Sequence, residues 1–136
     1  MREILFRGKT KKGEWHYGYY VDMAGFMEGS YIYSIEDTVY RKVTTGTVGQ
    51  YTGLTDKNGK KIFEGDIIGW NDGELDETGK PYEDEISEIV FCEDRKALIQ
   101  RFQSGFEDTL EGLNREFIRV LGNIHDNPEL LKGGAE

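Results

Sequence analysis

Glu64 and Asp66 are the residues whose type and spacing come nearest to a catalytic pair. Two carboxylates two positions apart on an extended chain share a face, as acid–base chemistry would need. They flank Gly65, however, and an aspartate beside a glycine is also a common turn residue, because its side chain accepts hydrogen bonds from nearby backbone N–H groups. We favour the turn and treat Glu64, Gly65 and Asp66 as a structural motif.

The soft metal ligands of the chain are His16, His125 and Cys92, and they are scattered along the sequence. Zinc sites are built from closely spaced Cys and His pairs, which this pattern lacks. Folding could still bring residues that are distant in the sequence together as a catalytic triad, although no local motif indicates one. We therefore predict no catalytic residues, no metal and no cofactor.

The segment Asp56-Lys57-Asn58-Gly59 superficially looks like a calcium-binding loop. The match fails because the glycine is fourth rather than sixth, and Lys60 takes the fifth place, where an oxygen ligand is needed. Asn58 and Gly59 instead predict a tight hairpin, since both residues tolerate positive φ.

Aromatic residues alternate with other types from Trp15 onward, and this period of two predicts a strand. Such a face could stack the bases of a single-stranded nucleic acid, or it could pack in a core or a protein interface, where Tyr and Trp are enriched. The net charge of −9 opposes binding to phosphates, so we favour packing. The candidate aromatic surface comprises Trp15, Tyr17, Tyr19, Tyr20, Tyr31 and Tyr33.

Acidic residues gather in residues 72–88, which hold eight acids and one base, whereas the rest of the chain has 16 bases against 18 acids. This segment predicts an exposed loop. It could imitate nucleic acid or engage a basic host protein, or it could be a solvated loop that keeps the protein soluble, which we favour. Its candidate contact residues are Asp76, Glu77, Glu83, Asp84 and Glu85.

Short strands and turns account for most of the remaining pattern, and 18 glycines against two prolines fit many tight turns. Residues 106–114 are ambiguous, because their apolar spacing suits a short helix that Gly112 weakens. Asn127 and Pro128 predict a helix start, with Asn127 as the N-cap. The fold class is therefore mainly β: a small or SH3-like barrel, or two packed sheets, with short helices that include one at the C-terminus.

The size and composition fit one intracellular domain. The chain has 136 residues and a single cysteine, which indicates a reducing compartment. Its N-terminal apolar run is three residues long, and it has no stretch of the roughly 18 apolar residues that a membrane span needs. We expect a soluble protein with a domain over residues 1–132 and a tail at 133–136.

Three blocks occur in order along nearly the whole chain: MREILFRG, VGQYTGLTDKNGKKIFEGDII and VLGNIHDNPELL. Together they resemble the YopX family of phage and prophage proteins. The resemblance implies a phage gene expressed in the cytoplasm of a bacterial host, and homo-oligomeric assembly is plausible for such proteins. The family has no assigned catalytic residues to carry over.

These observations favour a non-enzymatic protein that works through protein contacts and assembles with itself, with a host or phage protein as a further partner. The alternative is a nucleic-acid-associated accessory protein in phage replication or gene regulation, or an acidic inhibitor of a host DNA-binding protein. No membrane partner is expected.

Overall fold

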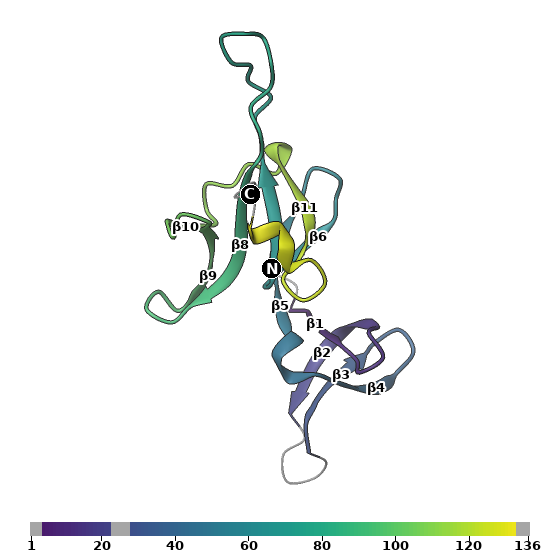
Figure 1. Cartoon of the computed structure of the whole chain (residues 1–136). Coiled ribbons are helices and arrows are strands. Elements are labelled where there is room, and N and C mark those ends of the chain that lie inside the picture. Colours follow the sequence, from purple (N-terminus) through teal and green to yellow (C-terminus); the bar gives the residue numbers. More distant parts are fainter. Residues whose placement is uncertain (1–3, 23–27, 133–136) are drawn as a thin grey trace. The chain divides into compact units, whose positions relative to one another are not determined.

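The computed structural model describes residues 4–22 and 28–132, so the predicted tail at 133–136 lies outside the described residues. The chain forms two compact units, Met1–Gly53 and Leu54–Glu136 (Figure 1). The single domain predicted over residues 1–132 stays a prediction.

The first unit is a coiled antiparallel sheet of consecutive hairpins. Its strands are β1 (Phe6–Lys9), β2 (Trp15–Asp22), β3 (Ser30–Ser34), β4 (Val39–Val43) and the first half of β5 (Gly49–Thr55). Their order is β4-β3-β2-β1-β5. The chain leaving β4 bends back toward β1, since the amide of Thr44 donates to the carbonyl of Lys9 at 2.8 Å. Ile32 and Val43 are buried in this unit.

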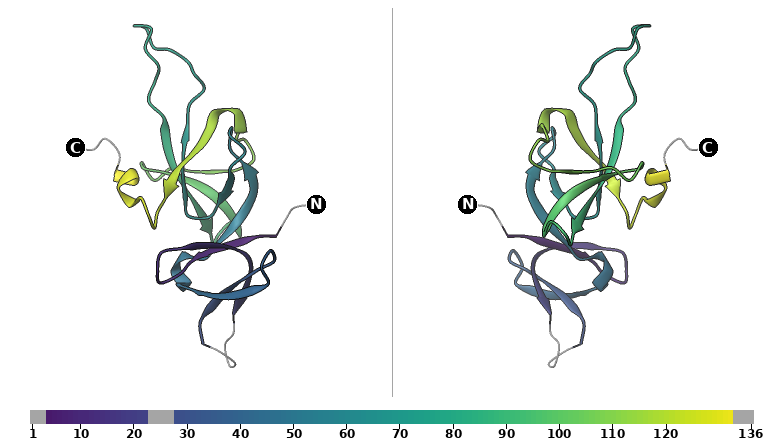
Figure 2. Two further views of the ribbon diagram at one scale, coloured as in Figure 1. Left: turned by 90° about the vertical axis from the view of Figure 1, so that its right-hand side faces the viewer. Right: turned by 90° about the vertical axis from the view of Figure 1, so that its left-hand side faces the viewer.

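The second unit contains a five-stranded antiparallel sheet in the order β10-β9-β8-β7-β11 (Figure 2). Its strands are β7 (Asp66–Trp70), β8 (Glu85–Cys92), β9 (Ala97–Phe102), β10 (Glu107–Thr109) and β11 (Ile118–Asn123). A short strand, β6 (Lys61–Phe63), follows β5. Ile62, Ile68, Ile89 and Ile118 form the core, each at most 1% exposed.

The mainly β prediction is confirmed, in its two-sheet form. Neither sheet closes into a barrel within residues 4–22 and 28–132. Helical structure in that part of the chain is limited to short 3₁₀ segments at Thr45–Thr47, Arg115–Phe117 and Pro128–Lys132.

The helix considered for residues 106–114 is not formed. Glu107–Thr109 instead pairs with β9 as strand β10. The turn at Gly105 brings these residues back beside β9, and the ladder then satisfies their backbone groups. The C-terminal helix start at Pro128 is confirmed as a single 3₁₀ segment.

One turn geometry recurs at residues 10–14, 56–60, 76–80 and 102–106. In each, the amide of the first residue donates to the carbonyl of the fifth, and the amide of the fourth donates to the carbonyl of the first. The fourth residue is always glycine, with φ between +81° and +94°. This is a three-residue loop that needs positive φ at one position only.

The hairpin predicted at Asn58-Gly59 is confirmed, but positive φ at both residues is not. Gly59 has a φ of +81°, whereas Asn58 is not among the residues with positive φ. The ladder closes between Asp56 and Lys60, one residue wider than a two-residue loop would allow. Asn58 thus has a favourable right-handed conformation and only the glycine is left-handed.

Asp56 anchors this hairpin to a distant strand. Its side chain is 2% exposed. One carboxylate oxygen, Oδ1, accepts from the amides of Asn58 and Lys60, both at 2.9 Å. The other, Oδ2, accepts from the amide of Val120 in β11, also at 2.9 Å. The turn and β11 are therefore held by the same buried charge.

Replacing Asp56 should cost far more stability than replacing Asp76, which has the same place in the turn at residues 76–80. Asp56→Ala leaves the partly buried amide of Val120 without its carboxylate acceptor and also removes two bonds in the turn, so we expect a loss of about 2–4 kcal/mol in the free energy of unfolding. Asp76→Ala removes only exposed bonds within its own turn, with an expected loss of about 0.5–1.5 kcal/mol. Urea denaturation of both variants measures the difference, and equal losses would contradict the anchoring role.

Candidate interaction surface

Five tyrosines come together on one face of the first unit. Cross-strand pairing places Tyr19 opposite Tyr33, and Tyr33 opposite Tyr40. Directly opposed residues of an antiparallel pair share a face, and residues two apart in one strand do so as well. We call this set the tyrosine face: Tyr17, Tyr19, Tyr31, Tyr33 and Tyr40.

The tyrosine face is open to solvent although it is aromatic. Tyr17, Tyr19 and Tyr40 are 48%, 49% and 51% exposed. The ring centroids of Tyr33 and Tyr40 are 4.7 Å apart, so these rings support each other. A contiguous exposed aromatic patch is uncommon on a protein that works alone, and such patches mark interaction sites.

The charged residues on the same face are all basic. The strand register adds Arg7 and Lys9 from β1 and Lys42 from β4. The Arg7 guanidinium lies 4.7 Å from the ring centroid of Trp15 and the Lys9 ammonium 5.9 Å from it, which are cation–π distances. Among the described residues that the register of β1–β4 places on this face, none is acidic.

The predicted aromatic set is thus divided between the two faces of the sheet. Tyr20 lies on the opposite face, with its ring 5.8 Å from that of Phe6 and its hydroxyl 3.3 Å from that of Ser30. Tyr40, which is exposed and in register with the face, was not in the predicted set. Only the pairing of β3 with β4 identifies it.

Gly18 lets β3 approach β2 behind this face. A Cβ atom at Gly18 would overlap the carbonyl oxygen of Tyr33. The glycine is therefore needed for the close approach of two strands that carry Tyr17, Tyr19 and Tyr33.

The acidic segment is an ordered hairpin rather than a long loop. Residues 71–84, which we call the acidic arm, extend beyond the ends of β7 and β8 (Figures 1 and 2). An isolated bridge joins Leu75 to Pro81. The loop predicted for residues 72–88 is wrong at its C-terminal end, because Glu85–Cys92 is strand β8 and Ser87 is 1% exposed. The apolar alternation after Glu85 overrides the acidic composition.

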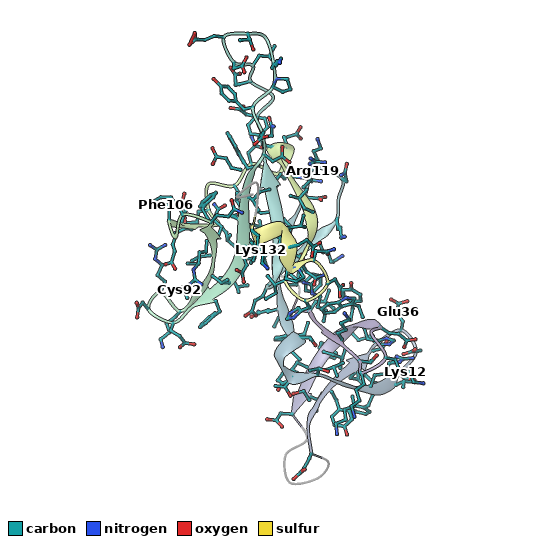
Figure 3. All side chains as sticks on the ribbon, in the orientation of Figure 1. Lys12, Glu36, Cys92, Phe106, Arg119 and Lys132 are labelled. Atoms are coloured by element: carbon teal, nitrogen blue, oxygen red, sulfur yellow. The ribbon has the colours of Figure 1, made fainter. Side chains whose placement is uncertain are left out.

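Asp84 fixes the base of the acidic arm. Its carboxylate accepts from the Asn71 amide at 3.0 Å and from the Arg119 guanidinium at 2.9 Å, and Arg119 projects at this end of the sheet (Figure 3). Burial raises the pKa of Asp84, but the bonds from Asn71 and Arg119 outweigh that effect and lower it overall. The Asn71 side chain also donates to the carbonyl of Tyr82 at 2.8 Å, which ties the two limbs together.

The tip of the acidic arm is fixed in the same way as the turn at Asp56. The Asp76 carboxylate accepts from the amides of Thr78 and Lys80, at 2.8 and 3.0 Å.

Between base and tip, an open groove of about 800 Å³ is lined by Trp70, Leu75, Tyr82 and several carboxylates. Of the predicted acidic contact residues, Glu77, Glu83 and Glu85 are exposed, whereas Asp76 and Asp84 are partly buried in these bonds.

Gly65 and Asp66, predicted as part of a structural motif, shape a turn. Asp66 is 1% exposed, and its carboxylate accepts from the amide of Phe63 at 2.7 Å, while Gly65 has a φ of +94°. This closes the turn between β6 and β7. The Asn127 side chain accepts from the amide of Asn123 at 3.3 Å, so it fastens the chain just before Pro128.

The described residues offer no candidate for a metal site or for a membrane-spanning helix. No group of three or more His, Cys, Asp or Glu side chains in that part of the chain could hold a metal ion. No helix there is long and apolar enough to cross a bilayer.

Comparison with known proteins places the chain in a family. The family model described as YopX protein matches residues 5–132. The chain belongs to the YopX family. No curated protein matches it. Among solved structures, this YopX-family chain is similar to protein EF1440 from Enterococcus faecalis, with 24% identity and a TM-score of 0.57. The match covers 96% of this chain and 99% of that one, and it shows a shared fold.

Gly18→Ala should destabilise the first unit. The new methyl group meets a backbone oxygen that cannot rotate away, so we expect a loss of about 2–3 kcal/mol in the free energy of unfolding. Gly46→Ala is the matched control, because a Cβ there has no heavy atom within 4 Å. Thermal denaturation compares the two. Similar melting temperatures for both variants would mean that β3 can move away from β2 at little cost.

The contribution of Asp84 to stability should depend on pH. Its folded pKa is lower than its unfolded value, so its stabilising contribution is complete above the unfolded pKa of about 3.9 and disappears as the pH falls through the folded pKa. We expect Asp84→Asn to flatten the loss of stability below about pH 5, measured by urea denaturation at several pH values. Asp94→Asn, an exposed change in the β8–β9 turn, should leave the slope unaltered.

Proposed function

We propose that this YopX-family chain is a non-enzymatic, phage- or prophage-encoded protein that works in the cytoplasm of a bacterial host. It acts by protein–protein contact, and first by binding copies of itself through the tyrosine face. The observation that carries the proposal is that five tyrosines share this face and that three of them are about half exposed.

The composition of the face suits a protein interface. Tyrosine offers a large apolar surface with a polar hydroxyl and few rotatable bonds, and so it is enriched where proteins bind each other. Basic residues at the margin, such as Lys9 and Lys42, add steering and orientation. A catalytic role has no comparable support, since Asp56, Asp66 and Asp84 are committed to bonds that hold backbone or the arm in place.

The family context supports the setting. The YopX match supports the phage or prophage origin that the resemblance implies, and the structural relative comes from a bacterium. The single thiol, Cys92, is compatible with a reducing cytoplasm.

Single-stranded nucleic acid is a second candidate for the tyrosine face, and the distribution of charge favours it. The sequence of residues 1–53 has seven basic and six acidic residues, whereas residues 54–136 have ten and 20. The overall charge of −9 therefore belongs to the second unit, and it does not speak against phosphates at the first. Stacked aromatic rings with nearby cations are the usual platform for single strands.

Removing exposed rings from the tyrosine face should weaken self-association. We expect Tyr17→Ser/Tyr40→Ser to raise the dissociation constant at least about tenfold, because aromatic side chains dominate interface energetics. Sedimentation velocity across a concentration series measures the change.

The matched control is Phe106→Ser, which removes a ring that is 62% exposed in the second unit (Figure 3). A monomeric wild-type protein at the highest concentration would refute self-association. Such a monomer could then be tested with a short oligothymidylate at low salt. Binding that is lost in Tyr17→Ser/Tyr40→Ser would establish single-stranded nucleic acid as the ligand of the tyrosine face instead.

A further inference from the structure

The acidic arm has features that a purely solubilising loop does not need. Leu75 and Tyr82 are 57% and 58% exposed, although both lie in a segment rich in carboxylates. Large apolar side chains displayed on an ordered projection are characteristic of a segment that inserts into a partner.

The arm is already shaped for binding. Asn71, Asp84 and Arg119 hold its base, and the Asp76 turn holds its tip. A segment that is ordered before it binds loses less conformational entropy on association, so more of its contact energy appears as affinity.

The arm and the tyrosine face are complementary in charge. Residues 71–84 contain six acids and one base. Lys9 and Lys42 border the tyrosine face, and the β1–β2 turn beside it adds Lys11 and Lys12, whereas Arg7 is only 5% exposed. The two surfaces therefore differ in the sign of their charge, and both expose aromatic side chains.

The two surfaces are also similar in size. A five-residue limb of the arm spans about 16 Å when extended, and the four strands β1–β4 span about 14 Å across. The exposed tyrosines alone fall short of a stable interface: three half-exposed rings offer about 300 Å², against about 800 Å² per partner in a typical complex. Symmetric packing of two tyrosine faces would therefore be weak, and the arm supplies the missing area.

We propose that the acidic arm of one copy lies across the tyrosine face of a second copy, with Leu75 and Tyr82 between the tyrosines and the arm carboxylates near Lys9 and Lys42. This inference rests on the proposed self-association and names the segment that occupies the face. Two reciprocal contacts close a dimer, whereas unreciprocated contacts build an open chain.

Charge reversal on each side tests this pairing with the full-length protein. The face variant is Lys9→Glu/Lys42→Glu, and the arm variant is Glu74→Lys/Glu83→Lys. Each variant alone should raise the dissociation constant at least about tenfold, because like charges then oppose each other. Glu93→Lys/Asp94→Lys is the matched control, since it changes the net charge as the arm variant does but at the exposed β8–β9 turn.

Combination of the two reversals gives the decisive measurement. An equimolar mixture of the face and arm variants should associate again, because the substituted residues of the two variants carry opposite charges and the remaining contact between them keeps its natural residues. A single chain with all four substitutions should also recover association. This rescue separates a broken interface from a misfolded variant. Sedimentation velocity at low and high salt follows both, and high salt should weaken the restored complexes.

The outcomes distinguish the inference from the proposed function. Suppose that Tyr17→Ser/Tyr40→Ser loses association, while the arm variant and its control have equal dissociation constants. This result would overturn the arm–face pairing and leave self-association standing. Loss of association in both charge variants without rescue in the mixture would likewise overturn the pairing. A wild-type chain that is monomeric throughout would overturn self-association and the pairing with it.

Discussion

The second unit depends on one buried charge, the carboxylate of Asp56. Burial raises the pKa of this group, and the amides of Val120, Lys60 and Asn58 together more than compensate and lower it. The carboxylate therefore stays ionised inside the protein, where an ionised group must find hydrogen-bond donors. One of these donors is 64 residues away in β11, and the amide of Lys57 donates to the carbonyl of Ile118 beside it, so the Asp56 side chain helps to fix the two ends of the unit relative to each other.

The same turn has different consequences at its two aspartate-capped positions. Residues 56–60 and 76–80 share the pattern Asp-x-x-Gly-Lys and the same backbone hydrogen bonds. At residues 56–60 the carboxylate has a second oxygen directed to β11, and the turn becomes part of the fold. At residues 76–80 it bonds only within its own turn among the bonds described here, and so it gives a rigid tip to an exposed hairpin. Burial, not sequence, separates the two roles.

The sequence predicts those features that depend on local pattern. The alternation from Trp15 to Val21 identified strand β2 and the ring positions of Tyr17 and Tyr19, and Gly65 identified its turn. Features set by pairing were missed. Tyr40 joins the tyrosine face only through its register with Tyr33. The strand β10 forms because β9 is available beside it, which a local pattern cannot show.

The charge of the whole chain does not describe each of its surfaces, for a related physical reason. Charges act over about 8–10 Å at moderate salt, so a surface responds to its own neighbourhood and not to the molecular sum. The acids of residues 71–84 are confined to the arm of the second unit, while the described tyrosine face has only cations. In the proposed pairing, the attraction between the arm and the tyrosine face acts at short range and only in the correct orientation.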